Sequence, residues 1–293
     1  MFDYKLLEAL ACVVHEQGFD KASGKLHITQ SAVSQRIKLL EDQVGQVLVT
    51  RTAPPKATRD GKRLLKHYMQ VKSLEADLEQ SMETKGKKHF QVFPIGINAD
   101  SLATWFFPAI STFLRDHKIL LDLKVDDQNE THKMLRNGEV AGCISSEKTS
   151  VQGCRVTALG TMTYRLAATN HFVKEYFPQG LDELSVQTAP AVIFNRKDDL
   201  HAKCFKKRFK THIMNIPVNY VPSSEKFAWM IMDGLAYGMI PDLQGLEHIK
   251  SGLLVDIAPT CHIGVKLYWH RWSLSSRFLD DFSRAIEKNE VIC

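Results

Sequence analysis

Apolar residues recur every three or four positions through the first forty residues, which is the period of a helix with one buried face. Three such stripes follow one another, and the first ends near Gly18. Thr29 is expected to cap the third helix, because its hydroxyl can accept a free backbone N–H. The stripes are Leu6, Leu7, Leu10, Val13 and Val14, then Phe19, Ala22 and Leu26, then Val33, Ile37 and Leu40.

The opposite face of the third helix is polar and begins at the helix N-terminus. Amide and hydroxyl side chains can read base edges, while a helix N-terminus and basic residues hold phosphates. Two short helices with the second in the major groove make a helix-turn-helix, although a solvated polar face on a small bundle is the alternative. The candidate DNA-binding residues are Gln30, Ser31, Ser34, Gln35, Arg36 and Lys38.

The stretch "VLVTRTAPPKAT" (47–58) alternates and then breaks at two prolines, as expected for a two-stranded wing. Arg51 and Lys56 would lie over flanking phosphates. From Thr58 a narrow apolar stripe continues for about six turns, which suits the seam of a two-helix dimer. A helix that packs within its own chain is the alternative. The seam residues are Leu64, Tyr68, Val71, Leu74 and Leu78, with Met82 beyond them.

Beyond a polar break, "GKKH" at 86–89, apolar runs of strand length alternate with segments of helix length. This rhythm predicts parallel sheets with helices on their faces. The region is too long for one small sheet, so we expect two lobes with a cleft between them. Strands are expected at 91–98, 120–127, 141–146, 189–195, 218–224, 239–242 and 262–270, and helices at 102–116, 131–140, 225–238 and 275–288.

Three strand ends carry polar residues that could meet in this cleft. Asp100 and Ser101 start one helix, and Ser224 starts another, where free N–H groups can hold a carboxylate. Asp126 ends a strand, where side chains of open α/β folds face the cleft. An anion site opposite carboxylates would suit a zwitterionic basic amino acid. Plain helix capping and solvated surface acids are the alternatives.

Composition adds limits to this picture. The 293 residues are 44% hydrophobic and 24% charged, as in soluble globular proteins, and no run of about 18 apolar residues suggests a membrane span. The N-terminus does not read as a secretory signal, so we expect a cytoplasmic protein. The six cysteines are scattered without a CxxC pair, and no HExxH occurs. We therefore expect no metal and no cofactor.

Charge is unevenly distributed along the chain. Residues 19–66 hold ten basic and four acidic residues, a net charge of +6, so the rest of the chain sums to −1 within a total of +5. A basic N-terminal module on a near-neutral body indicates a polyanion contact at one end.

The stretch "ASGKLHITQSAVSQRIKLLE" resembles the hallmark pattern of the LysR-type transcriptional regulators, with Ser23 where an alanine is common. The resemblance implies an N-terminal all-α winged helix-turn-helix with a long linker helix. It also implies a dimer that assembles into a tetramer on double-stranded DNA, and contact with RNA polymerase.

Segments of the body, such as "INADSLATWFFPA", "SSEKF", "MIPDLQ" and "LYWHR", resemble the effector domain of the lysine- and arginine-responsive members of that family. The resemblance implies a C-terminal α/β effector domain of two lobes, like a periplasmic binding protein. It further implies a lysine or arginine effector and control of a basic amino-acid exporter gene. Carried over by position, the effector-binding residues are Asn98, Asp100, Ser101, Asp126 and Ser224.

The expected division is a DNA-binding domain at 1–58, a dimerisation helix at 59–84, a hinge at 85–91 and an effector domain at 92–293. Lobe I covers about 92–161 plus 269–293, and lobe II about 162–268. Two other functions stay open. One is a replication-initiation inhibitor or nucleoid factor that binds A·T-rich DNA by shape. The other is a small-metabolite enzyme, for which no GxGxxG, GxxxxGK[ST] or GxSxG is present.

Overall fold

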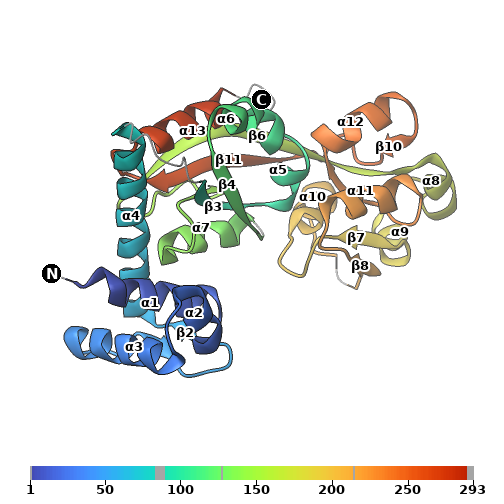
Figure 1. Ribbon diagram of the computed structural model, residues 1–293. Coiled ribbons are helices and arrows are strands. Elements are labelled where there is room, and N and C mark those ends of the chain that lie inside the picture. Colours follow the sequence, from blue (N-terminus) through green and yellow to red (C-terminus); the bar gives the residue numbers. More distant parts are fainter. Residues whose placement is uncertain (1, 83–89, 127, 214, 289–293) are drawn as a thin grey trace.

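The computed structural model describes residues 2–82, 90–126, 128–213 and 215–288. An N-terminal domain stands at one end of an upright helix, α4, and an elongated body extends sideways from the other end (Figure 1). Most of the predicted hinge, 85–89, lies outside the described residues. This three-part arrangement agrees with the expected fold class.

The N-terminal domain is built on the three predicted apolar stripes, which meet in one cluster. Leu7, Leu10 and Leu40 are fully buried within it. Helix α1 follows an N-cap, Asp3, and α2 ends at His27 in the left-handed region, which turns the chain into α3. The elements are α1 (Tyr4–His15), α2 (Phe19–Leu26), α3 (Gln30–Val44), β1 (Val49–Thr50) and β2 (Lys56–Ala57).

Helix α4 (Arg59–Ser81) begins at the N-cap Thr58, whose hydroxyl accepts from the Gly61 N–H at 3.1 Å. Its first turns belong to the core of the N-terminal domain, because Tyr68 is buried there and Leu64 packs beside it. Burial raises the pKa of Tyr68 to about 12. Farther along, Leu74 and Leu78 are 40% and 58% exposed. Only the later part of the predicted seam therefore faces outward in the single chain.

One seven-stranded sheet runs through the whole body, in the order β10-β6-β11-β5-β3-β4, with β9 also paired to β6. Strands β3, β4 and β5 are mutually parallel where they pair, whereas β6, β11, β9 and β10 pair antiparallel. The strands are β3 (Gln91–Ile97), β4 (Ile119–Val125), β5 (Gly142–Ser145), β6 (Cys154–Thr169), β9 (Gly238–Pro241), β10 (Leu254–Asp256) and β11 (Ile263–Trp272).

The prediction of parallel sheets was therefore wrong for half of the body. The 16-residue strand β6 was not predicted. It pairs with β11 along the full length of β11. Its early residues mix half-buried and exposed positions instead of forming one apolar run, so they did not read as a strand. Two long antiparallel strands thus join the lobes, and helices cover the faces of a mixed sheet.

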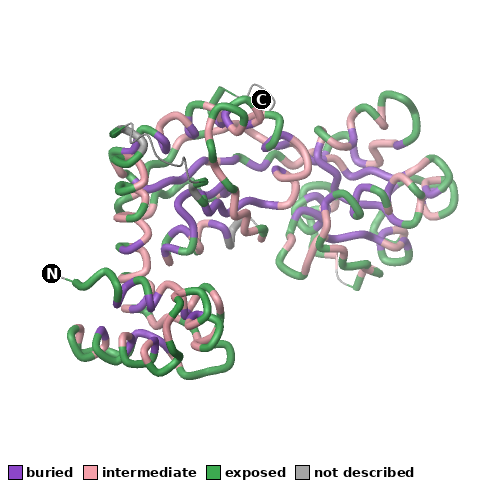
Figure 2. Tube along the Cα trace, in the orientation of Figure 1, coloured by how far each residue is buried: buried purple, intermediate pink, exposed green. Residues whose placement is uncertain are grey.

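Lobe I holds the β3–β5 region, and lobe II holds the far ends of β6 and β11 with a small parallel pair, β7 and β8 (Figure 1). Buried residues of both lobes belong to one core cluster, and along the long strands they alternate with half-buried and exposed ones (Figure 2). The register of β6 and β11 shifts between Leu267 and Tyr268, opposite Gly160 and Ala158. The remaining elements are α5 (Ala99–Ala103), α6 (Phe106–Asp116), α7 (Gln128–Asn137), α8 (Asn170–Tyr176), α9 (Glu183–Thr188), β7 (Ala191–Ile193), α10 (Leu200–Phe209), β8 (Val218–Tyr220), α11 (Ser224–Met232), α12 (Asp242–Lys250) and α13 (Arg277–Glu287).

Candidate functional site

Helix α3 presents its polar face to the outside. Val33, Ile37 and Leu40 are buried against α1 and α2, as predicted from their spacing. The Thr29 hydroxyl accepts from the Ala32 N–H at 3.2 Å, so the predicted cap is present. On the opposite face five of the candidate DNA-binding residues are exposed and Arg36 is half-buried; the exposed ones are Gln30, Ser31, Ser34, Gln35 and Lys38.

The wing is held against the end of α3 by one carboxylate. Glu41 Oε1 accepts from the backbone N–H groups of Leu48 and Val49, at 2.7 and 3.3 Å. Strands β1 and β2 then pair antiparallel, and their ends carry the exposed side chains of Arg51 and Lys56. The exposed basic wing and the polar helix are therefore joined by hydrogen bonds, and both are exposed on the N-terminal domain, as in winged helix-turn-helix proteins that bind DNA.

The cleft between the lobes is crossed by a hydrogen-bonded bridge. Asp100, in α5 of lobe I, accepts from the Ser224 hydroxyl at 2.6 Å and from the Tyr164 hydroxyl at 2.7 Å. Ser224 starts α11 in lobe II, and its Oγ also lies 3.2 Å from Oε1 of Gln244. The structure therefore brings two of the predicted effector residues, Asp100 and Ser224, into direct contact.

The other three predicted effector residues stand at neighbouring strand ends. Asn98 follows β3 and is 4% exposed, and Ser101 is fully buried in α5. The Asp126 N–H donates to the Ile97 carbonyl at 3.2 Å, so the end of β4 lies beside the end of β3. Among the described residues, Asn98 Oδ1 and Ser101 Oγ are buried without a hydrogen-bond partner. Buried polar atoms of this kind are suited to meet a polar ligand.

A hollow of about 580 Å³ opens next to this bridge, between α5, α6 and β4 of lobe I and the start of α11. Of the predicted effector residues only Ser224 lines it. Most of the other lining side chains are apolar, including Leu102, Phe107 and Val125. Ser224 therefore connects the bridge to the wall of the hollow, whereas Asp100 and Tyr164 do not line it.

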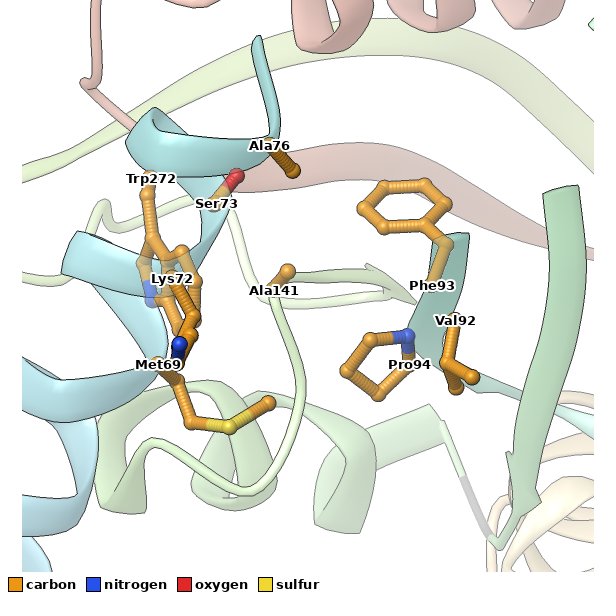
Figure 3. Close-up of a pocket in the computed structure, with 9 residues that line it drawn as sticks. All are labelled: Met69, Lys72, Ser73, Ala76, Val92, Phe93, Pro94, Ala141 and Trp272. Carbon is orange, nitrogen blue, oxygen red and sulfur yellow. The ribbon is translucent and has the colours of Figure 1, made fainter. Parts of the chain in front are cut away.

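A second hollow, of about 200 Å³, lies between helix α4 and the body. In Figure 3 the side chains of α4 face those at the start of β3 across it. Close by, Gly138 packs so tightly on α4 that an added Cβ would lie 2.5 Å from the Cβ of Lys66. Helix α4 thus packs within its own chain as well as exposing an apolar stripe. The lining residues are Met69, Lys72, Ser73, Ala76, Val92, Phe93, Pro94, Ala141 and Trp272.

Sequence reasoning missed Tyr164 and Gln244 at the bridge. Tyr164 lies in the unpredicted strand β6, so no local pattern pointed to it. Gln244 belongs to the stretch "PDLQ", whose start marks the end of a strand and the beginning of α12. A polar residue one turn into a helix that follows a buried strand was the available signal.

Within the described part of the chain, no three His, Cys, Asp or Glu side chains gather as a metal site would require. The same residues include no helix long and apolar enough to cross a bilayer.

The chain as a whole resembles known proteins. Residues 4–62 match the family described as bacterial regulatory helix-turn-helix protein, lysR family. The HTH-type transcriptional regulator ArgP of Aeromonas salmonicida is 41% identical, covering 97% of this chain and 98% of its own length.

Two solved structures share the fold along the whole chain. ArgP from Mycobacterium tuberculosis is 36% identical with a TM-score of 0.86, covering 98% of this chain and 97% of its own. Full-length LysG from Corynebacterium glutamicum, with bound arginine as effector, is 34% identical with a TM-score of 0.78 and the same coverage.

Proposed function

The chain belongs to the LysR family of bacterial transcriptional regulators and is a DNA-binding regulator of the ArgP type, and we propose that lysine or arginine controls it from the cleft between its lobes. The bridge between Asp100 and Ser224 carries this proposal, because it places a carboxylate between the two lobes. It is supported by the bound arginine of the LysG structure.

In the DNA complex we assign base reading to the amides and hydroxyls of α3, and phosphate binding to the basic residues. Gln30 and Ser34 stand one turn apart on the exposed face, so both can enter the major groove. Arg51 and Lys56 on the wing reach the backbone beside it. The first group supplies sequence preference, and the second supplies affinity at any sequence.

In the effector complex the cationic group of the amino acid takes the place of a hydroxyl on Asp100. A charged donor binds a carboxylate more strongly than the Ser224 or Tyr164 hydroxyl does. Asp126 supplies a second carboxylate at the adjoining strand end. Asn98, Ser101 and Ser224 offer the polar atoms that orient the rest of the ligand. Because the bridge joins lobe I to lobe II, exchanging its partner changes the relative stability of lobe arrangements.

The working unit is a dimer that pairs into a tetramer. Exposed apolar side chains of Leu74 and Leu78 in α4, and of Met82 just after it, suit contact with a partner helix. Each lobe arrangement would set a different spacing of the recognition helices on DNA. The amino acid then acts at a promoter only through its differential affinity for these arrangements. The regulated gene is a basic amino-acid exporter, and regulation proceeds through RNA polymerase in the cytoplasm, without catalysis.

A binding titration tests the effector. Arginine is added to the full-length protein in a calorimeter, in parallel with citrulline, which has nearly the same shape without the side-chain charge, and agmatine, which lacks the carboxylate. We expect arginine to bind and both analogues to bind at least about tenfold more weakly, one charged hydrogen bond being worth roughly 1.5–3 kcal/mol. Asp100→Asn should reduce arginine affinity, and Asp126→Ala should do so while leaving DNA binding without effector intact. If citrulline binds with the same affinity as arginine, recognition of the cationic group is contradicted.

A fluorescence-anisotropy titration tests the regulator. The protein is added at one fixed salt concentration to DNA from upstream of a basic amino-acid exporter gene and to a random duplex, each with and without lysine or arginine. Selective binding that responds to either amino acid is expected. Equal binding to both duplexes without a response would favour the architectural A·T-rich DNA factor instead.

A further inference from the structure

Lobe II carries a strongly basic segment that the DNA-binding domain does not account for. Between Arg196 and Lys210 there are seven basic and two acidic residues, a net charge of +5. The total charge is +5 and residues 19–66 contribute +6, so the chain outside these two segments sums to −6. Positive charge is thus concentrated in two places, the DNA-binding domain and helix α10 with the loop before it.

Most of the basic residues of α10 lie on its exposed side, and only Lys207 among those described below reaches back to the body. The helix buries Leu200, His201, Cys204 and Phe205, which all belong to its inner face. Its cations are exposed: Lys203, Lys206, Lys207, Arg208 and Lys210. Lys203 and Lys206 lie one turn apart on the outer side of the helix, and the C-cap Lys210 follows the last turn, so these three lysines form a basic row along α10.

Contacts within the fold neutralise little of this charge. Lys203 pairs with Asp199 at 2.7 Å, in an arrangement where both groups are about half exposed. Asp198 is largely withdrawn from solvent, and burial raises the pKa of its carboxyl. Lys207 donates to the His262 carbonyl at 3.2 Å, which holds its position without removing its charge. Favourable interaction with the helix dipole explains cations in the last turn, but not the row that begins at Lys203.

We propose that the outer face of α10 is a second DNA-contacting surface, which binds the phosphodiester backbone without reading sequence. Charge complementarity favours this partner, because the chain already binds a polyanion through its basic N-terminal domain. The row from Lys203 to Lys210 spans about 10 Å along the helix axis, and duplex DNA presents one negative charge per about 1.7 Å. Lysine side chains suit this role, since they act as flexible point charges on phosphates.

This contact requires DNA that extends beyond the recognition helices. Two recognition helices of a dimer occupy about 20 base pairs, because half-sites lie one turn apart. A duplex of about 60 base pairs leaves long flanks that can reach lobe II when the DNA bends. The inference rests on DNA binding through α3, and the short duplex measures that binding separately.

The experiment compares full-length wild-type protein with the triple variant Lys203→Gln/Lys206→Gln/Lys210→Gln. A matched control, Arg115→Gln/Lys118→Gln/Lys174→Gln, removes the same charge from exposed residues elsewhere on the body. Affinity for random duplexes of about 20 and about 60 base pairs is measured over a range of salt concentrations. Circular dichroism verifies that both variants are folded.

On the long duplex the α10 variant should bind about tenfold more weakly at low salt. The magnitude of its salt slope should fall by about 2–3, since each lost phosphate contact contributes about 0.9. On the short duplex it should match wild type, and the control should match wild type on both. An unchanged slope on the long duplex, equal losses in the control, or equal losses on both duplexes would overturn the proposal. Binding of both proteins to poly-glutamate is measured in parallel. If the α10 variant keeps DNA binding but loses binding to poly-glutamate, the surface contacts an acidic protein, and the proposal is likewise overturned.

Discussion

A single buried histidine makes the stability of lobe II depend on pH. His201 lies in α10 with 2% exposure, and its ring stands between those of Phe205 and Tyr237, with centroids 6.2 and 6.0 Å away. Among the described residues, neither ring nitrogen has a hydrogen-bond partner. Burial lowers the pKa of His201 from 6.5 to about 3, because the charged ring cannot be hydrated there.

The sign follows from proton linkage. The unfolded state binds a proton at higher pH than the folded state, so stability is fully present above pH 6.5 and falls as the pH decreases toward 3. One pH unit within this window costs about 1.4 kcal/mol. Near pH 5, about 1.5 units below the unfolded pKa, lobe II should have lost roughly 2 kcal/mol relative to neutral pH.

Hydrogen exchange read by mass spectrometry gives the opening free energy of lobe II, in peptides from α10 and β9. Wild type is compared with His201→Leu, and with His212→Gln as a control at an exposed histidine. The acid-induced loss between about pH 7.5 and pH 5 should be roughly 2 kcal/mol larger in wild type than in His201→Leu. The contribution of His270, whose pKa is also lowered by burial, is common to all three proteins. Equal losses in wild type and His201→Leu would refute the reasoning.

Three further outcomes follow from the structure. Gln30→Ala should relax base preference, whereas Arg51→Gln should weaken binding to all duplexes alike and reduce the salt slope by about 1; anisotropy titrations that show equal loss on operator and random DNA for both would contradict these roles. Gly138→Ala should lower the unfolding free energy by about 2–4 kcal/mol, because Gly138 has a left-handed backbone and an added Cβ would collide with Lys66. An unchanged melting temperature would show that α4 is not docked there. Leu78→Asp should shift the dimer toward monomer in sedimentation, and an unaltered oligomer would remove α4 from the interface.

The N-terminal domain could be predicted almost completely from its sequence, because local signals decide it. The stripe of Val33, Ile37 and Leu40 and the cap Thr29 each lie within one element, and all occur as predicted. Tyr68 shows the limit of such reasoning. A helix-period stripe reports that a face is buried, but not whether the neighbour is a partner chain or helix α1 of the same chain.

In the body the strand ends were predictable, and their pairing was not. Asp100 and Ser224 were singled out separately, from helix starts 124 residues apart, and only the fold brings them together. Tyr164 was missed because strand β6 has no uniform apolar pattern. The basic surface of α10 was not predicted, because the net charge was summed over the whole body and acidic residues elsewhere cancel the +5 of residues 196–210.

Because strands β6 and β11 run through both lobes, they oppose movement of one lobe relative to the other. Lobes joined by loose linkers can swing widely at little cost, whereas a continuous ladder must be bent. The register shift between Leu267 and Tyr268 interrupts that ladder opposite Gly160, and bending is cheapest where hydrogen bonds are already irregular. A change in the angle between the lobes would therefore bend the paired strands at this irregular point. In a regulator with shared strands, effector binding would change the angle between the lobes only slightly, and this small change would alter the contacts between subunits.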